Sequence, residues 1–268
     1  AGRSRPAAAT WACSLSSSQT ALSTLGTLFS DKLTTAGLDW RAGMCSTAWY
    51  NASNGAWHNA WDWTTDAATI ESHFAAYGTG GSGIEAGFIS AENYVGRVHG
   101  GLPTSALRTD AQAHFIFVTD THEQSSGISS TQMTSWMNGL STTRAVAHGI
   151  TCPAGVLCAP GQGEEPEDPV SKYSEVIAAT GGVQGNILVF NPSSPDAATQ
   201  QQQRDTIDAI LTAVIGGTGT QLQRPPISPT IKVAVAAVRG SNCNKNDVPR
   251  SRTHGWDIDA ATRRIVFF

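Results

Sequence analysis

The sequence carries little charge and has no long apolar run. Only 14% of the 268 residues are charged, and the formal net charge is −4. The basic residues are scattered, which excludes the electrostatic footprint of a nucleic-acid binder. No apolar stretch approaches the roughly 20 residues of a membrane-spanning helix, and the first ten residues lack the apolar core of a signal peptide. We therefore expect a soluble chain without a membrane span or a nucleic-acid partner, from which any export signal has been removed.

Catalytic motifs are also missing. The sequence contains no Gly-x-Ser-x-Gly elbow, no HExxH helix and no Walker loop, so nucleophilic, zinc-protease and nucleotide chemistry have no starting point. His122 and Glu123, directly after Asp120, are the remaining candidates for a general base and its acid partner. We predict that the protein is not an enzyme, and a hydrolase that uses Asp120 and His122 is the minor alternative.

The five cysteines favour disulfides over a zinc site. They show no CxxC spacing and no histidine at zinc-finger distance. Cys152 and Cys158 bracket a short Pro/Gly loop, as a local disulfide would, and Cys13 and Cys45 are a second candidate pair. The odd count leaves Cys243 without an assigned partner. Disulfides would place the protein outside the cytoplasm, and five buried free thiols are the alternative.

Helices and apolar strands alternate along the chain. Apolar spacing and glycine stops predict helices over about 17–35, 66–77, 84–95, 133–140, 172–179 and 196–215. Apolar runs predict strands over 40–47, 114–120, 144–150, 186–190, 231–238 and 265–268, and 255–264 resembles a polar turn. This order is typical of an α/β fold with a doubly wound, mostly parallel central sheet and helices on both faces.

Two loops carry oxygen ligands to the edge where such sheets bind ligands. Residues 80–88 (GGSGIEAGF) place Ser82 in a glycine-rich loop that opens a helix, and Asp120 follows the strand HFIFV. Both would face the carboxyl ends of the strands. A hydroxyl and a carboxylate there suit Mg²⁺ or Ca²⁺. The alternatives are a plain turn at Ser82 and a helix cap at Asp120.

These phrases resemble a known family. GGSGIEAGF is similar to the second metal-binding loop of von Willebrand factor type A domains, and HFIFVTD is similar to their fourth strand. AGLDWRAGM, KYSEVIAATGG and the closing residues resemble other parts of a secreted, surface-associated bacterial subgroup, in the right order over residues 15–268. The resemblance implies a domain of this fold over residues 14–268. It also implies a metal-ion-dependent adhesion site that uses Ser82 and Asp120, with Ser14 or Ser16.

The resemblance breaks down at the first strand. The family has Asp-x-Ser-x-Ser at the end of this strand, whereas TWACSLSSSQ has serines and no aspartate. RPAAAT is also short and contains a proline. Since an empty central slot would leave buried backbone groups unpaired, we predict that residues 5–13 fill it or that a partner donates a strand. The missing aspartate favours an edge without bound metal.

Tryptophans are concentrated in one segment, WYNASNGAWHNAWDW, which we expect to be a loop. Trp57, Trp61 and Trp63 are candidates for a partner-docking or sugar-stacking platform; the alternative is that they cover the top of the fold. Taken together, the expectations describe an extracellular or cell-surface domain for adhesion or assembly that recognises a protein or surface partner. A metal-free structural subunit of a filament or surface layer is the alternative.

Overall fold

The computed structural model describes most residues between 5 and 216 and short pieces beyond them. The described residues are 5–11, 26, 28–36, 38–47, 60–76, 85–96, 107–140, 142, 144–153, 155–156, 158, 172–190, 196–216, 220–221, 233–234, 247–251, 256–259 and 264–267. Contacts divide the chain into two compact units, Ala1–Ala213 and Val214–Phe268. The single domain expected over residues 14–268 stays a prediction.

A six-stranded sheet forms the middle of the first unit, in the order β3-β2-β1-β4-β5-β6. Its strands are β1 (Arg5–Trp11), β2 (Trp40–Ser46), β3 (Ala60–Thr64), β4 (Gln112–Val118), β5 (Arg144–Thr151) and β6 (Gln184–Asn186). β3 is antiparallel to β2, and the other neighbours are parallel. The parallel strands therefore all end at one edge, the carboxyl edge, where folds of this class bind ligands.

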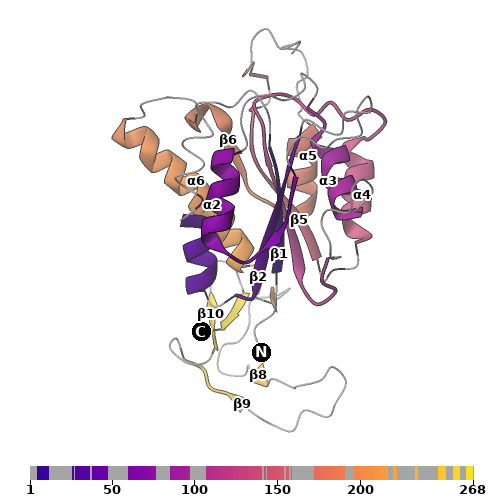
Figure 1. Cartoon of the computed structure of the whole chain (residues 1–268). Coiled ribbons are helices and arrows are strands. Elements are labelled where there is room, and N and C mark those ends of the chain that lie inside the picture. Colours follow the sequence, from indigo (N-terminus) through magenta and orange to yellow (C-terminus); the bar gives the residue numbers. More distant parts are fainter. Residues whose placement is uncertain are drawn as a thin grey trace. The chain divides into compact units, whose positions relative to one another are not determined.

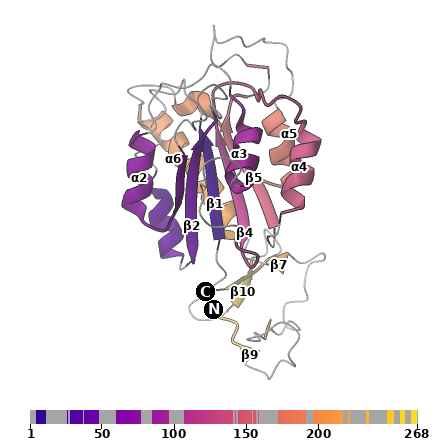
Figure 2. The same cartoon turned by 45° about the vertical axis from the view of Figure 1, so that its right-hand side comes forward.

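Helices cover both faces of this sheet. They are α2 (Ala67–Ala76), α3 (Gly87–Gly96), α4 (Ser130–Asn138), α5 (Lys172–Thr180) and α6 (Ala197–Gly216), in addition to the helical residues 28–35. Figures 1 and 2 show α2 and α6 on one face and α3, α4 and α5 on the other. The predicted doubly wound, mostly parallel α/β fold is confirmed. None of the helices in the described residues is both long and apolar enough to span a membrane.

β1 occupies the centre of the sheet, in the slot for which the sequence suggested residues 5–13 or a donated strand. It pairs with β2 over its whole length and with β4 from Ala7 onward. Pro6 precedes the ladder with β4, so the N–H that a proline lacks is not needed on that side. The backbone of this weakly patterned segment thus has hydrogen-bonded neighbours on both sides.

β4 and the helices beside it form a buried hydrophobic core. Six of the seven residues of β4 are buried, which explains its continuous apolar run, because a strand covered on both faces does not alternate. Phe117 of β4, Phe88 of α3 and Tyr173 of α5 pack ring against ring, with centroids 5.1–5.7 Å apart. These contacts hold α3 and α5 on one face of the sheet.

A histidine pair lies between β4 and β5. The Nδ1 of His114 and the Nε2 of His148 are 3.0 Å apart, and both residues are buried. The backbone N–H of Val183 donates to Nδ1 of His148 at 3.1 Å, so this network assigns the proton of a neutral His148 to Nε2, which donates to His114. Burial, and to a lesser extent the charge of Arg144, lower the pKa of His148 to about 4.

The strand predicted over residues 186–190 is wrong. β6 ends at Asn186, and Ile187–Phe190 form a 3₁₀ helix, η1. Asn186 starts this turn by accepting the N–H of Leu188 on its side-chain oxygen at 2.9 Å. Ile187 and Phe190 are buried while the two residues between them are half-buried. This three-residue spacing suits a 3₁₀ helix, and a short apolar run does not distinguish it from a strand.

Two predicted loops contain strands. Trp61 and Trp63 lie on β3, an edge strand of the first unit, and not in a loop. In the second unit, β10 (Trp256–Asp259) includes part of the predicted polar turn and pairs with β11 (Arg264–Phe267). The stretches WDWT of β3 and WDID of β10 alternate apolar and polar residues, a strand pattern that their tryptophans and aspartates obscured.

Beyond the last turn of α6, the described residues of the second unit form short strands. β7 (Thr220–Gln221) pairs with β11, which completes a three-stranded antiparallel sheet with β10. β8 (Val233–Ala234) pairs with β9 (Asp247–Val248). Of the strand predicted over 231–238, only β8 lies within the described residues.

Candidate binding site at the carboxyl edge

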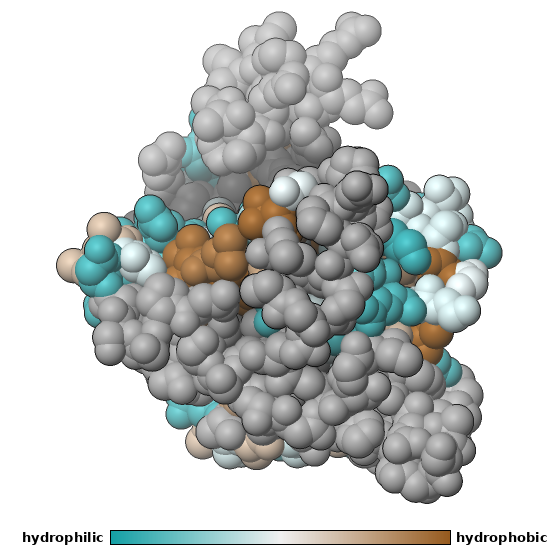
Figure 3. All heavy atoms as spheres, turned by 90° about the horizontal axis from the view of Figure 1, so that it is seen from above, coloured by the Kyte–Doolittle hydropathy of each residue, from teal (hydrophilic) through white to brown (hydrophobic). Residues whose placement is uncertain are grey.

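Asp120 lies at the carboxyl edge, two residues after the end of β4. The preceding residue, Thr119, donates its backbone N–H to the carbonyl of Ile150 in β5 at 3.1 Å, so the chain is held to the sheet up to that point. Asp120 is 6% exposed. Figure 3 looks down from the top of Figure 1 and shows hydrophobic and hydrophilic side chains next to each other on that face.

The loop around Asp120 is held by a buried carboxylate. Glu85 Oε2 accepts hydrogen bonds from the hydroxyls of Thr119 at 2.6 Å and Thr121 at 2.9 Å. The backbone N–H of Thr121 donates to the Thr119 hydroxyl at 3.1 Å, which closes a local turn of the kind that threonine side chains favour. Glu85, Thr119 and Thr121 are all at most 4% exposed. Asp120 therefore sits between two threonines that are attached to the same carboxylate.

The same loop caps helix α3. Glu123 Oε2 accepts the N–H of Phe88 at 3.1 Å, and the hydroxyl of Ser125 accepts the N–H of Ile89 at 3.0 Å. These amides belong to the first turn of α3, whose N–H groups have no partner within the helix and attract negative charge. Glu123 is buried, and burial raises its pKa, against hydrogen bonds that lower it. The loop after β4 and the start of α3 are thus one hydrogen-bonded unit.

Gly87 makes this capping contact sterically feasible. A Cβ atom at position 87 would lie 2.3 Å from the Tyr173 hydroxyl and 3.1 Å from Glu123 Oε2, closer than side-chain atoms pack. The Tyr173 hydroxyl is buried, and burial followed by the charge of Glu123 raises its pKa. A glycine at the first position of α3 therefore lets the carboxylate and the tyrosine approach the helix end together.

Backbone contacts join a third segment to this unit. The N–H of Ala86 donates to the carbonyl of Thr47, just after β2, at 2.8 Å. Gln124 bonds Glu85 twice: its N–H donates to the Glu85 carbonyl at 2.9 Å, and its side-chain oxygen accepts the Glu85 N–H at 2.8 Å. The ends of β2 and β4 and the start of α3 consequently form one connected rim, which we call the edge rim (residues 46–47, 85–90 and 119–125).

The structure changes the role proposed for Glu123. Its two oxygens accept the backbone N–H groups of Phe88 and Ser125, so it acts as a helix cap. A pairing of His122 and Glu123 as general base and acid stays a prediction. His122 itself is half-buried. The sequence did not reveal Glu123 as a cap because Phe88, whose N–H it accepts, lies 35 residues earlier, outside the range of local capping patterns.

The role of Glu85 was also missed. It stands in GSGIEAG, just before the helix. An acidic residue is common there, because its negative charge interacts favourably with the positive end of the helix dipole. The two threonines that it binds, in VTDT, flank Asp120 in the sequence. That symmetry is the signal that could have suggested a shared partner, although the sequence alone does not identify it.

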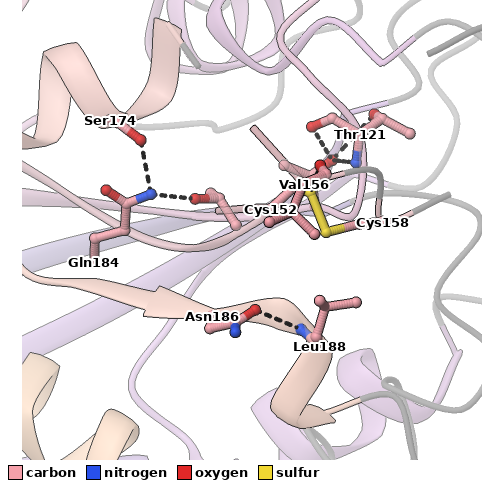
Figure 4. Close-up of a disulfide and its surroundings, with 10 residues drawn as sticks. Thr121, Cys152, Val156, Cys158, Ser174, Gln184, Asn186 and Leu188 are labelled. Atoms are coloured by element: carbon pink, nitrogen blue, oxygen red, sulfur yellow. Dashed lines mark hydrogen bonds between the residues drawn. A yellow bond between two sulfur atoms is a disulfide. The ribbon is translucent and has the colours of Figure 1, made fainter. Parts of the chain in front are cut away.

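The disulfide predicted between Cys152 and Cys158 is present at the same edge. It joins two cysteines six positions apart and closes a turn directly after β5. The N–H of Val156 donates to the carbonyl of Pro153 at 3.1 Å within it, and the Val156 side chain is 43% exposed. Figure 4 shows the disulfide with Thr121 and with Gln184, whose side-chain amide bonds Ser174 at 2.8 Å. A covalent bond therefore fixes the chain where β5 leaves the sheet.

The disulfide predicted for Cys45 is wrong. Cys45 is a buried free thiol in β2, and burial raises its pKa. Its sulfur lies 3.8 Å from the carbonyl oxygen of Ser90 in α3, so it packs as a small apolar side chain between strand and helix. Cys13 and Cys243 lie outside the described residues.

The tryptophans of β3 pack against the molecule. Trp61 stacks on His73 of α2, with ring centroids 4.7 Å apart. Trp63 meets Tyr94 of α3 edge to face at 5.4 Å, and the Arg41 guanidinium lies over its ring at 4.9 Å. Trp57 lies outside the described residues. Both described tryptophans are half-buried, and a partner-docking role for them stays a prediction.

The described residues do not complete a cation site. Among them, no three His, Cys, Asp or Glu side chains form a group that could hold a metal ion. Beside Asp120, the rim carboxylates Glu85 and Glu123 already serve as acceptors for threonine hydroxyls and for the first turn of α3. Ser82, Ser14 and Ser16, the other predicted ligands, lie outside the described residues. The metal site therefore stays a prediction.

The strand order β3-β2-β1-β4-β5-β6 and the helices on both faces define a doubly wound α/β fold of the Rossmann-like class. No family model matches the chain, and no curated protein matches it. It is similar to a solved structure of proximal thread matrix protein 1 from the mussel byssus with a zinc-occupied MIDAS motif. The identity is 13% and the TM-score 0.48, over 81% of this chain and 46% of that one.

A second crystal form of the mussel protein gives 11% identity and a TM-score of 0.45, over 78% of this chain and 48% of that one. The chain thus spans about half the length of the solved chains it matches. At these identities the likeness concerns the fold alone.

Proposed function

We propose that this chain is an extracellular binding domain for adhesion or assembly, in which a protein or surface partner contacts the edge rim beside Asp120. The observation that carries the proposal is the construction of the rim. Three separate segments are joined by buried hydrogen bonds around one aspartate, at the edge where this fold class binds ligands. Such preorganisation lowers the ordering cost of binding.

The disulfide supports an extracellular location. Cys152 and Cys158 are bonded at the same edge as Asp120, and structural disulfides persist in oxidising compartments. The exposed Val156 in the disulfide-closed turn gives the edge an apolar contact point. A partner at this edge would contact two segments that are held in place, the edge rim after β4 and the disulfide-closed turn after β5.

The cation-dependent form of the proposal assigns one divalent ion to Ser82 and Asp120, with Ser14 or Ser16. Mg²⁺ or Ca²⁺ bound there would offer an open position to a carboxylate of the partner. The other form is a metal-free structural subunit, whose partner is another copy or another subunit. It is favoured by the internal hydrogen bonds that already occupy Glu85 and Glu123 in the described rim.

A comparison of two aspartates tests the proposal. Asp120 lies at the carboxyl edge, and the exposed Asp110 precedes β4 at the opposite end of the same strand. The wild type, Asp120→Ala and Asp110→Ala would be titrated with Mg²⁺ and Ca²⁺ by calorimetry. Their retention on a poly-glutamate surface and their self-association in sedimentation would be measured with Mg²⁺ and with EDTA.

Each outcome decides between the forms. Cation binding and Mg²⁺-dependent retention that Asp120→Ala abolishes, and Asp110→Ala preserves, support the cation-dependent form. Self-association in EDTA that Asp120→Ala weakens supports the metal-free form. If the wild type shows neither retention nor self-association, or if the two variants behave alike in both assays, binding through the edge rim beside Asp120 is wrong.

A further inference from the structure

We propose that Glu85 is the positioning residue for Asp120: its carboxylate holds the threonines on both sides of the aspartate and so fixes the Asp120 backbone at the edge. This inference rests on the proposed function, because it assigns Asp120 a role in binding. It concerns a side chain that is not itself expected to touch the partner, since Glu85 is 3% exposed.

The geometry explains why one carboxylate is sufficient. The hydroxyls of Thr119 and Thr121 both donate to the same oxygen, Oε2, at 2.6 and 2.9 Å. Glu85 Oε2 is the nearest acceptor for both hydroxyls; the Thr119 hydroxyl also lies 3.3 Å from the Thr121 carbonyl oxygen, and it accepts the Thr121 N–H. The three-residue turn is therefore closed from inside the protein, and Asp120 is its middle residue.

Glu85 is itself held in place. Its N–H and carbonyl both bond Gln124, and the next residue, Ala86, bonds Thr47 after β2. The carboxylate is thus attached to a backbone that is fixed to two other rim segments. Removal of this acceptor would leave the buried hydroxyl donors of both threonines without it, which costs more than a typical hydrogen bond contributes.

This arrangement is independent of any cation. Every contact that defines the turn is made between side chains and amides of the chain itself, so the turn is expected to be formed in EDTA. A loop ordered only by a bound ion would instead be open without it. The positioning role can consequently be measured in the absence of metal, separately from binding.

Substitutions at position 85 separate the loss of the hydrogen-bond acceptor from the loss of a carboxyl group. Glu85→Gln keeps a side-chain oxygen that can accept both threonine hydroxyls, whereas Glu85→Ala removes it. Thr121→Val removes one donor with little change in shape. Ser125→Ala is the matched control. It removes the buried hydrogen bond that the Ile89 N–H donates to the Ser125 hydroxyl, and none of the hydrogen bonds given for the described rim joins Ser125 to either threonine.

The test is amide exchange of residues 119–125 by NMR in EDTA, together with the retention and self-association assays. We expect exchange of the Thr121 amide to rise on the order of tenfold or more in Glu85→Ala, with binding reduced by a similar factor. Glu85→Gln is expected to restore both to within about threefold, since it can accept the same hydrogen bonds. Ser125→Ala is expected to leave the Thr121 amide protected.

The two proposals can fail separately. If the wild type binds in either assay and Glu85→Ala binds and exchanges like it, Glu85 does not position Asp120, whereas edge binding stands. The positioning role is likewise wrong if Glu85→Gln fails to restore what a folded Glu85→Ala protein loses. If the wild type does not bind in either assay, the proposed function fails, and the positioning role for binding fails with it.

Discussion

β4 and β1 are neighbours in the same sheet, yet their sequences have little in common. β4 reads QAHFIFV and is buried along nearly its whole length, whereas β1 reads RPAAATW, with small residues and a proline. Both make parallel ladders, and β1 is hydrogen-bonded to two strands. Burial of large side chains therefore anchors β4, and parallel backbone pairing to β2 and β4 holds β1 in the sheet.

The largest expected effect comes from emptying the core beside β4. Phe117 is fully buried against Phe88 and Tyr173, so Phe117→Ala leaves a cavity and should lower the free energy of unfolding by about 3–5 kcal/mol. Chemical denaturation measures it. A decrease in the free energy of unfolding no larger than the roughly 0.5 kcal/mol of a surface substitution would contradict the packing described for β4.

Breaking the backbone ladder tests β1. Ala9→Pro removes an N–H in the middle of the central strand and should cost about 3 kcal/mol or more. Pro6→Ala is the control, since Pro6 precedes the ladder with β4, and should change the free energy of unfolding by at most about 0.5 kcal/mol. If Ala9→Pro unfolds at the same denaturant concentration as the wild type, residues 5–11 do not occupy the central slot.

The buried pair of His114 in β4 and His148 in β5 predicts that stability depends on pH. The pKa of His148 falls from 6.5 to about 4 on folding, so the unfolded chain binds the proton first as the pH falls. The stability from neutral His148 is therefore present above pH 6.5 and is lost as the pH falls toward 4, by on the order of 3 kcal/mol in total.

Denaturation of the wild type and of His148→Asn across this pH range measures that loss. Asparagine keeps an acceptor near the position of Nδ1 for the Val183 N–H but does not titrate. The variant should therefore have a flatter stability profile between pH 4 and 6.5. Parallel profiles for the two proteins would show that His148 is not the group responsible.

A smaller effect is expected on the opposite side of β1. A Cβ at Gly43 of β2 would lie 2.0 Å from the Tyr94 hydroxyl, which donates to the Trp61 carbonyl at 2.5 Å. Gly43→Ala should force Tyr94 away and cost about 1–3 kcal/mol, measurable as a lower unfolding midpoint. Gly43→Ala combined with Tyr94→Phe should recover part of the loss. If it recovers none, the clash with the Tyr94 hydroxyl is not the cause of the lower stability.

The same contrast explains what the sequence could predict. Helix and strand patterns long enough to repeat, such as HFIFV and the segment around Met133, determined the elements and the fold class correctly. Short segments were misassigned where a tryptophan or an aspartate disguised an alternating strand, as in β3, or where an apolar run of four residues formed a 3₁₀ helix. Local spacing does not separate these cases.

The candidate site was predictable only in part. The position of Asp120 at the carboxyl edge follows from the strand before it, because parallel strands all end on one side. The contacts of Glu85 with the threonines, and of Glu123 with α3, join residues that are 34–36 apart in the sequence. Such contacts depend on tertiary structure, and no local motif encodes them.

The most direct test of edge binding compares the wild type with Asp120→Ala and Asp110→Ala in retention on poly-glutamate and in self-association, with Mg²⁺ and with EDTA. We expect the wild type to bind in at least one of these assays. Asp120→Ala should lose on the order of tenfold or more, a difference of about 1.4 kcal/mol, and Asp110→Ala should match the wild type. Equal binding by the two variants, or no binding by the wild type, would contradict recognition through the edge rim.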